Sequence, residues 1–169
     1  TAAVSESSKT LIGAGFVLVF TIPMVRILIN SGVNMGDLPS MPRAMAELVA
    51  SSVGDIYPVF APTVGALGAF IAGSNTVSNL MMSQFQFDTA GLIGVSGAMM
   101  VAGQAVGAAA GNMIAIHNVV AASATVGLLG REGQTLRLTV IPTIYYIVAA
   151  GLILLFAIHV LGVTDPLML

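Results

Sequence analysis

Two clusters of small polar residues interrupt an otherwise apolar sequence. The first is the run Gly73-Ser74-Asn75-Thr76-Val77-Ser78-Asn79, and the second is the run Gly111-Asn112-Met113-Ile114-Ala115-Ile116-His117-Asn118. Hydroxyls, amides and the free N–H groups at a helix start can hold a small anion. Histidine adds a side chain whose charge changes near neutral pH. The two clusters therefore indicate a binding site for a small polar anion, and His117 is a candidate for proton handling.

The composition places these clusters in a membrane protein. The 169 residues are 57% hydrophobic and only 7% charged, whereas a soluble domain is about 25% charged. Five Lys and Arg against seven Asp and Glu cannot form a basic stripe, so no nucleic-acid partner is expected. Without cysteine, disulfides, thiolate metal sites and cysteine nucleophiles are excluded. No metal or cofactor is predicted. No sequence motif of a membrane hydrolase occurs either, so an enzyme is not expected.

The elements that must position the clusters are predicted to be helical throughout. Residues 56–87 carry no formal charge, and as one helix they would reach roughly 48 Å, less than two crossings of a bilayer. Because the first cluster lies in their middle, a re-entrant hairpin is the economical solution. The predicted elements are a spanning helix at 10–29, an amphipathic helix and the hairpin within 43–88, a broken spanning helix at 91–130, a polar loop at 131–139 and a final spanning helix at 140–162.

This arrangement favours a transporter with a defined orientation. Irregular backbone survives at membrane depth only inside protein or beside a water-filled cavity, and broken helices that meet near the midplane are typical of secondary transporters. The count of crossings places Lys9, Arg131 and Arg137 on one face, which the positive-inside rule assigns to the cytoplasm. Because a transporter usually needs two repeats, we expect the chain to be part of a longer polypeptide.

Each feature also has a purely structural interpretation. Polar residues in membrane helices often serve only as interhelical hydrogen-bond partners, and the spacing of Gly103, Gly107 and Gly111 favours close helix packing. His117 could be a core histidine with satisfied hydrogen bonds, and His159 is expected at the membrane interface. The rival functions are a channel segment, which would need a continuous polar stripe, and a noncatalytic membrane scaffold.

Three runs of the sequence resemble the C-terminal region of bacterial L-lactate permeases. They are GAFIAGSNTVSN at 68–79, GNMIAIHNVVAASATVGLLGREG at 111–133 and IPTIYY at 141–146, and the likeness extends from about residue 11 to 161. The resemblance implies a proton-coupled symporter of L-lactate and related 2-hydroxymonocarboxylates such as glycolate, in the bacterial inner membrane. Ser74-Asn75-Thr76 also resembles the hairpin-tip signature of the wider ion-transporter superfamily. By that likeness the chain is the second of two inverted repeats, and its partner is a missing N-terminal half.

The expected fold is thus all-α, with spanning helices, a re-entrant helical hairpin and a broken transmembrane helix. Lactate or glycolate, protons and the lipid bilayer are the expected partners, and another small organic anion coupled to Na⁺ is the alternative. His117 is the first candidate for proton coupling and Asp55 the second. The predicted substrate-binding residues are Ser74, Asn75, Thr76 and Asn79 at the hairpin tip, and Asn112, His117, Asn118, Ser123 and Thr125 around the helix break.

Overall fold

The computed structural model describes residues 19–20 and 22–165, which fall into two units, Thr1–Met41 and Pro42–Leu169. In the first unit, residues 22–29 are helical. The side chain of Asn34 then organises the connector, because its Oδ1 accepts hydrogen bonds from the N–H groups of Gly36 and Leu38 at 2.9 and 3.1 Å. Half of the spanning helix predicted at 10–29 lies outside the described residues.

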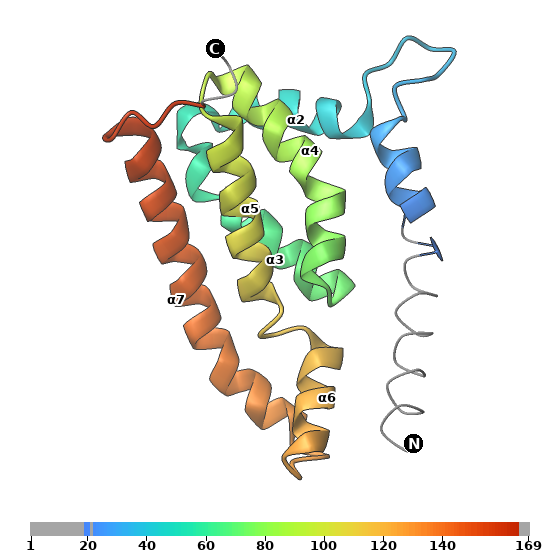
Figure 1. The fold of residues 1–169 in the computed structure, drawn as a ribbon, viewed down its shortest axis with the longest axis vertical. Helices are drawn as coiled ribbons and strands as arrows, with labels where there is room; N and C mark the ends of the chain where they lie inside the picture. The colour runs from blue at the N-terminus through green and yellow to red at the C-terminus, as the bar shows by residue number, and fades with distance from the viewer. Residues whose placement is uncertain (1–18, 21, 166–169) are drawn as a thin grey trace. The chain divides into compact units, whose positions relative to one another are not determined.

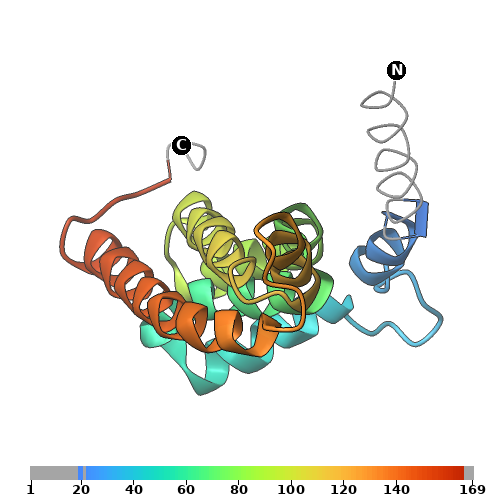
Figure 2. The same cartoon turned by 90° about the horizontal axis from the view of Figure 1, so that it is seen from below.

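The second unit consists of helices, and no strand occurs in the described part of the chain. In chain order they are α2 (Met41–Ser52), the 3-10 helix η1 (Gly54–Val59), α3 (Ala61–Ala72), α4 (Asn75–Ile93), α5 (Gly97–Gly111), α6 (Ile116–Thr125) and α7 (Glu132–His159). Helix α5 packs against α3, α4 and α7, and both views place it between α4 and α7 (Figures 1 and 2). The predicted all-α fold class is confirmed.

Helices α3 and α4 form a hairpin whose tip is a sharp break at two residues. Gly73 adopts φ 60°, a left-handed conformation that suits glycine, and its N–H donates to the Ala69 carbonyl at 2.6 Å. Ser74 follows as the N-cap of α4, and its hydroxyl accepts from the Val77 N–H at 3.3 Å. The break is shorter than expected: from Asn75 onward the polar cluster is helical, because Ser74 supplies the cap that starts a helix.

The second predicted break separates α5 from α6. These two helices are bent by 49° across residues 112–115, and Ala115 is extended with ψ 120°. Figure 1 shows the α3–α4 hairpin ending near the level of this break, which is also the level of the middle of α7. Among the described helices, α7 is long and apolar enough to cross a membrane, and the bent pair is a second candidate if it forms one span.

The prediction of a polar loop over 131–139 was wrong. Helix α7 starts at Glu132 and ends at His159, so it begins earlier and ends earlier than the predicted span at 140–162. Glu132 favours the early start, because a carboxylate in the first turn is stabilised by the helix dipole. Its Oε1 also accepts a hydrogen bond from the Gly130 N–H at 2.8 Å. Farther along, Thr139 satisfies its hydroxyl within the helix by donating to the Leu136 carbonyl at 3.1 Å.

Small residues bring the helix backbones into direct contact. A Cβ on Gly107 would lie 1.9 Å from the Pro62 carbonyl oxygen, and one on Gly111 would lie 2.2 Å from that of Ala66. Both glycines of α5 therefore face α3, which confirms close packing at these two positions. Gly103 faces Leu154 of α7 instead.

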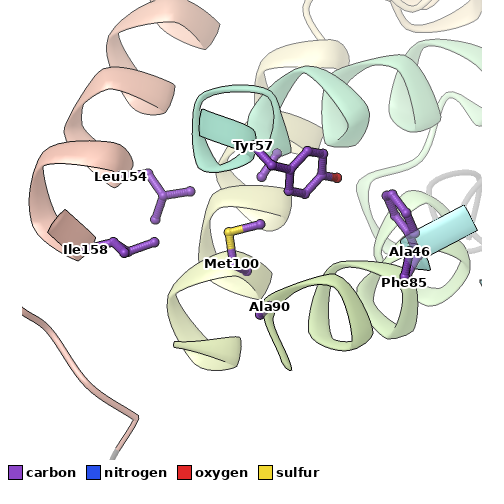
Figure 3. Packing of buried hydrophobic residues seen from close by; sticks show 8 residues of the cluster. Ala46, Tyr57, Phe85, Ala90, Met100, Leu154 and Ile158 are labelled. Carbon is purple, nitrogen blue, oxygen red and sulfur yellow. The ribbon is translucent and has the colours of Figure 1, made fainter. Parts of the chain in front are cut away.

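Above these contacts lies a core cluster that joins η1, α4, α5 and α7. Within it Tyr57 and Phe85 make an edge-to-face pair, with ring centroids 6.0 Å apart and an interplanar angle of 77°. Met100, Leu154 and Ile158 fill the space on the other side of Tyr57 (Figure 3). The cluster thus ties α7 to the helices that carry the hairpin tip.

Candidate functional site

The two helix breaks meet. The imidazole of His117, in the first turn of α6, lies directly against the hairpin tip, since a Cβ on Gly73 would be 1.2 Å from His117 Nε2. Its neighbour Asn118 points its amide nitrogen at the Gly73 carbonyl, 3.3 Å away, and at the Asn112 carbonyl and side-chain oxygens, 3.5 and 3.4 Å away. The sequence predicted two separate polar breaks, and the structure joins them into one polar cluster.

Two helix N-termini open at this cluster. Helix α4 begins at Asn75 after the Ser74 cap, and α6 begins at Ile116 after Ala115, which has no side-chain acceptor to offer. The first N–H groups of a helix have no partner within the helix and carry about half a positive charge. Two such ends beside one another make an environment that favours an anion such as a carboxylate.

The remaining tip residues include one buried oxygen atom without a hydrogen-bond partner among the described residues. The Asn79 amide nitrogen donates to Asn75 Oδ1 at 3.2 Å, and Asn79 Oδ1 is buried without a hydrogen-bond partner among the described residues. A buried acceptor without a donor is costly, and a ligand hydroxyl would satisfy it. Thr76, in the first turn of α4, is exposed, as is His117.

Three of the predicted site residues lie apart from this cluster. Ser123 is only 2% exposed, and its hydroxyl has no partner among the described residues. Thr125, at the far end of α6, is exposed and donates to the Ala122 carbonyl of its own helix at 2.7 Å. Asp55 belongs to the other end of the bundle, where its carbonyl oxygen lies 2.9 Å from His159 Nε2.

Asp55 lines a separate cavity of about 890 Å³, which lies between the end of α4 with the turn that follows it and the end of α7. Asp165 also lines this cavity, and its carboxylate accepts a hydrogen bond from the Ala98 N–H at 2.9 Å. Acidic groups and a helix N-terminus thus gather at the opposite end of the helices from the hairpin tip. Within the described residues, no group of three His, Asp or Glu side chains could hold a metal ion.

The sequence did not predict a set of buried polar side chains that are hydrogen-bonded to one another between the hairpin and α5. Gln86 of α4 and Gln104 of α5 are both 0% exposed, and the Gln86 amide nitrogen donates to Gln104 Oε1 at 3.1 Å. Gln104 stands within an apolar stretch, and Gln86 lies between two phenylalanines. A buried amide must find a hydrogen-bond partner. The sequence indicates that such an amide needs a partner. It does not indicate which residue is the partner, because the two glutamines lie on different helices.

Comparison with known proteins identifies the family of this chain. Residues 1–161 match the family described as L-lactate permease. The chain belongs to the L-lactate permease family. It is therefore a membrane protein, and the resemblance found in the sequence is confirmed.

Three curated relatives illustrate the similarity. A putative L-lactate permease of Haemophilus influenzae is 36% identical over 83% of this chain and 26% of its own length. The glycolate permease GlcA of Escherichia coli is 35% identical over 67% of this chain and 20% of its own length, and the L-lactate permease of Salmonella typhi is 35% identical over 68% and 21%. The chain thus spans about a quarter, or less, of these relatives. No solved structure matches it.

Proposed function

We propose that this chain forms part of a secondary active transporter that takes up L-lactate and related 2-hydroxymonocarboxylates such as glycolate, coupled to protons, in the bacterial inner membrane. The observation that carries the proposal is the meeting of the two helix breaks, where His117 and Asn118 of α6 contact Gly73 at the hairpin tip. Membership of the L-lactate permease family and the names of the relatives support the substrate class.

The substrate carboxylate would lie at the N-termini of α4 and α6. Free N–H groups in the first turns, at Asn75, Thr76 and His117, would donate to its two oxygens. The 2-hydroxyl group would then donate to an amide oxygen of the same cluster, and Asn79 Oδ1 is the buried acceptor that lacks a donor. A ligand with both groups would satisfy the whole cluster, and one without the hydroxyl would leave this oxygen unpaired.

Proton coupling would come from His117. A protonated imidazole at the cluster would attract the carboxylate, whereas a neutral imidazole would attract it less. Each protonation state then prefers a different occupancy, which is the difference in affinity that coupling requires. Asp55 is the second candidate, although it lies beside His159 at the other end of α7.

The test is transport by the full-length permease in proteoliposomes. The wild-type protein should accumulate lactate when a pH gradient is imposed, and His117→Gln should still exchange labelled lactate but lose accumulation, because glutamine forms hydrogen bonds without titrating. His159→Gln is the matched control and should accumulate lactate normally.

Two outcomes would contradict the proposal. If the wild-type protein transports neither lactate nor glycolate, the proposed function is wrong. Normal accumulation by His117→Gln, or accumulation driven by a Na⁺ gradient alone, would remove the role of His117 in proton coupling.

A further inference from the structure

A continuous chain of hydrogen bonds connects η1, the α3–α4 hairpin and α5. The Tyr57 hydroxyl donates to Gln86 Oε1 at 2.9 Å, and the Gln86 amide nitrogen donates to Gln104 Oε1 at 3.1 Å. The Gln104 amide nitrogen then donates to Ser78 Oγ at 3.1 Å, and the Ser78 hydroxyl donates to the Gly65 carbonyl at 2.8 Å. All four side chains are buried. Each member thus donates onward to the next.

Two glycines of α3 leave space for these hydrogen-bonded side chains. A Cβ on Gly65 would lie 2.2 Å from the Gln104 carbonyl oxygen, and a Cβ on Gly68 would lie 2.5 Å from Ser78 Oγ. Any larger residue at either position of α3 would push α4 or α5 away. The glycines of α3 therefore make room for the contact between Gln104 and Ser78.

Before it ends at the Gly65 carbonyl of α3, this chain of hydrogen bonds passes through Ser78 in the first turn of α4, next to the candidate site. The Ser78 N–H donates to the Ser74 carbonyl at 3.0 Å, so Ser78 is bonded to the residue that caps the helix. The next residue, Asn79, carries the buried acceptor of the site. Gln104 thus reaches from α5 to the turn of α4 that holds the tip residues in place.

We infer that Gln104 is a positioning residue for substrate binding: by holding Ser78, it fixes the first turn of α4 and with it the hairpin tip. This inference rests on the proposed function, because it assumes that the tip binds the substrate. Helix α5 then acts on the site twice, once through Gln104 and once through the break that leads to Asn118. Gln104 touches no part of the proposed substrate position itself, so its effect passes through Ser78.

The test compares Gln104→Met with Thr89→Val in the full-length permease. Methionine keeps the length of glutamine and loses both polar atoms. Thr89 is equally buried in α4, but its hydroxyl donates only to the Phe85 carbonyl of the same helix, at 2.8 Å. Two quantities are measured: amide hydrogen exchange along α4, which needs no substrate, and the KM and kcat of lactate uptake.

Gln104→Met should speed exchange at the Val77 and Ser78 amides, and not at the far end of α4. It should also raise the KM for lactate by about fivefold or more, the factor expected from unpairing a buried group, while kcat changes little. Thr89→Val should alter neither exchange at the tip nor KM. If Gln104→Met fails to fold, Ser78→Ala removes the same bond from the α4 side without adding volume, and the same changes are expected.

Unchanged exchange at Val77 and Ser78 in Gln104→Met and Ser78→Ala would overturn the inference. Faster exchange with an unchanged KM would also overturn it if Asn75→Ala, measured in parallel, raises the KM. If neither Gln104→Met nor Asn75→Ala changes the KM, the proposed binding of lactate at the tip fails instead, and the exchange data alone show that Gln104 holds the tip.

Discussion

Gly73 is the residue on which the site geometry depends most directly. It ends α3 with φ 60°, its carbonyl oxygen faces the Asn118 amide, and its missing side chain leaves the space that the His117 ring occupies. A side chain at this position cannot coexist with the ring, because a Cβ would lie 1.2 Å from Nε2. Glycine is thus required here for space as well as for backbone conformation.

The substitution Gly73→Ala should therefore abolish or strongly reduce lactate uptake by the full-length permease, at least about tenfold, because it displaces His117 from the tip. Gly94→Ala is the matched control. Gly94 has a similar φ of 73°, but nothing lies within 4 Å of the position of its Cβ, so it should lose only about 1 kcal/mol of stability from backbone strain. Equal uptake by the two variants would show that the His117 contact has no role.

The residues of the site could be predicted only in part. Gly73, Ser74, Asn112 and His117 stand out because each breaks a long apolar run, which is a local signal. That His117 lies against Gly73 could not be predicted, because this contact depends on how α3 packs on α5. The hydrogen bond between Gln86 and Gln104 could not be predicted for the same reason, since a glutamine does not reveal a partner on another helix.

At the scale of elements, α5 is the helix of the second unit that packs against α3, α4 and α7. Its glycines allow contact with the α3 backbone on one side, and Gly103 receives Leu154 of α7 on another. Ser96 caps its N-terminus by accepting from the Met99 N–H at 3.2 Å. Helix α5 therefore packs against both helices of the hairpin and against α7.

This packing predicts opposite signs for two glycine-to-alanine substitutions. Gly107→Ala should lower the stability of the permease by about 1–3 kcal/mol, because its Cβ would meet the Pro62 backbone at 1.9 Å. Gly91→Ala, in α4 with nothing within 4 Å of its Cβ position, should raise stability by about 0.5–1 kcal/mol through helix propensity. Thermal unfolding in detergent measures both. A stabilising effect of Gly107→Ala would contradict the close α3–α5 contact.

The helix type of each element was predictable from apolar runs and polar breaks, whereas some boundaries were not. The segment 132–139 has the composition of a loop, yet it forms the start of α7 because Glu132 suits a helix N-terminus. The break at the hairpin tip was predicted over seven residues and occupies two, because Ser74 starts α4 at once. Interactions of single residues at a helix end thus determine where the helix starts, and the overall composition of a segment does not predict this position.

At the scale of the whole molecule, we expect the hairpin to enter and leave the membrane on one side. Asp55 lies beside His159 at the C-terminal end of α7, while Arg131 immediately precedes its N-terminal end. Figure 1 shows α4 running back from the tip toward the end of the bundle where α7 finishes. Asp88, in the second half of α4, should therefore lie on the same side of the membrane as Asp55.

Labelling of single cysteines in the full-length permease tests this topology. Asp55→Cys and Asp88→Cys should react with an impermeant thiol reagent from one side of the membrane, and Arg131→Cys should react from the other. We expect the side of Arg131 to be the cytoplasm, since Lys and Arg favour it. Reaction of the cysteines at 55 and 88 from opposite sides would show that the hairpin crosses the membrane completely.

The central claim, that the hairpin tip forms part of the lactate-binding site, is tested most directly by lactate binding to two purified full-length variants. Asn75→Ala removes a tip amide that accepts from Asn79, whereas Asn30→Ala removes an exposed amide that donates to the Arg26 carbonyl in the connector. Leaving a buried polar group unpaired costs about 1–3 kcal/mol, so Asn75→Ala should weaken binding roughly 5- to 150-fold. Asn30→Ala should bind lactate as the wild-type protein does. Equal affinities of the two variants would contradict the account.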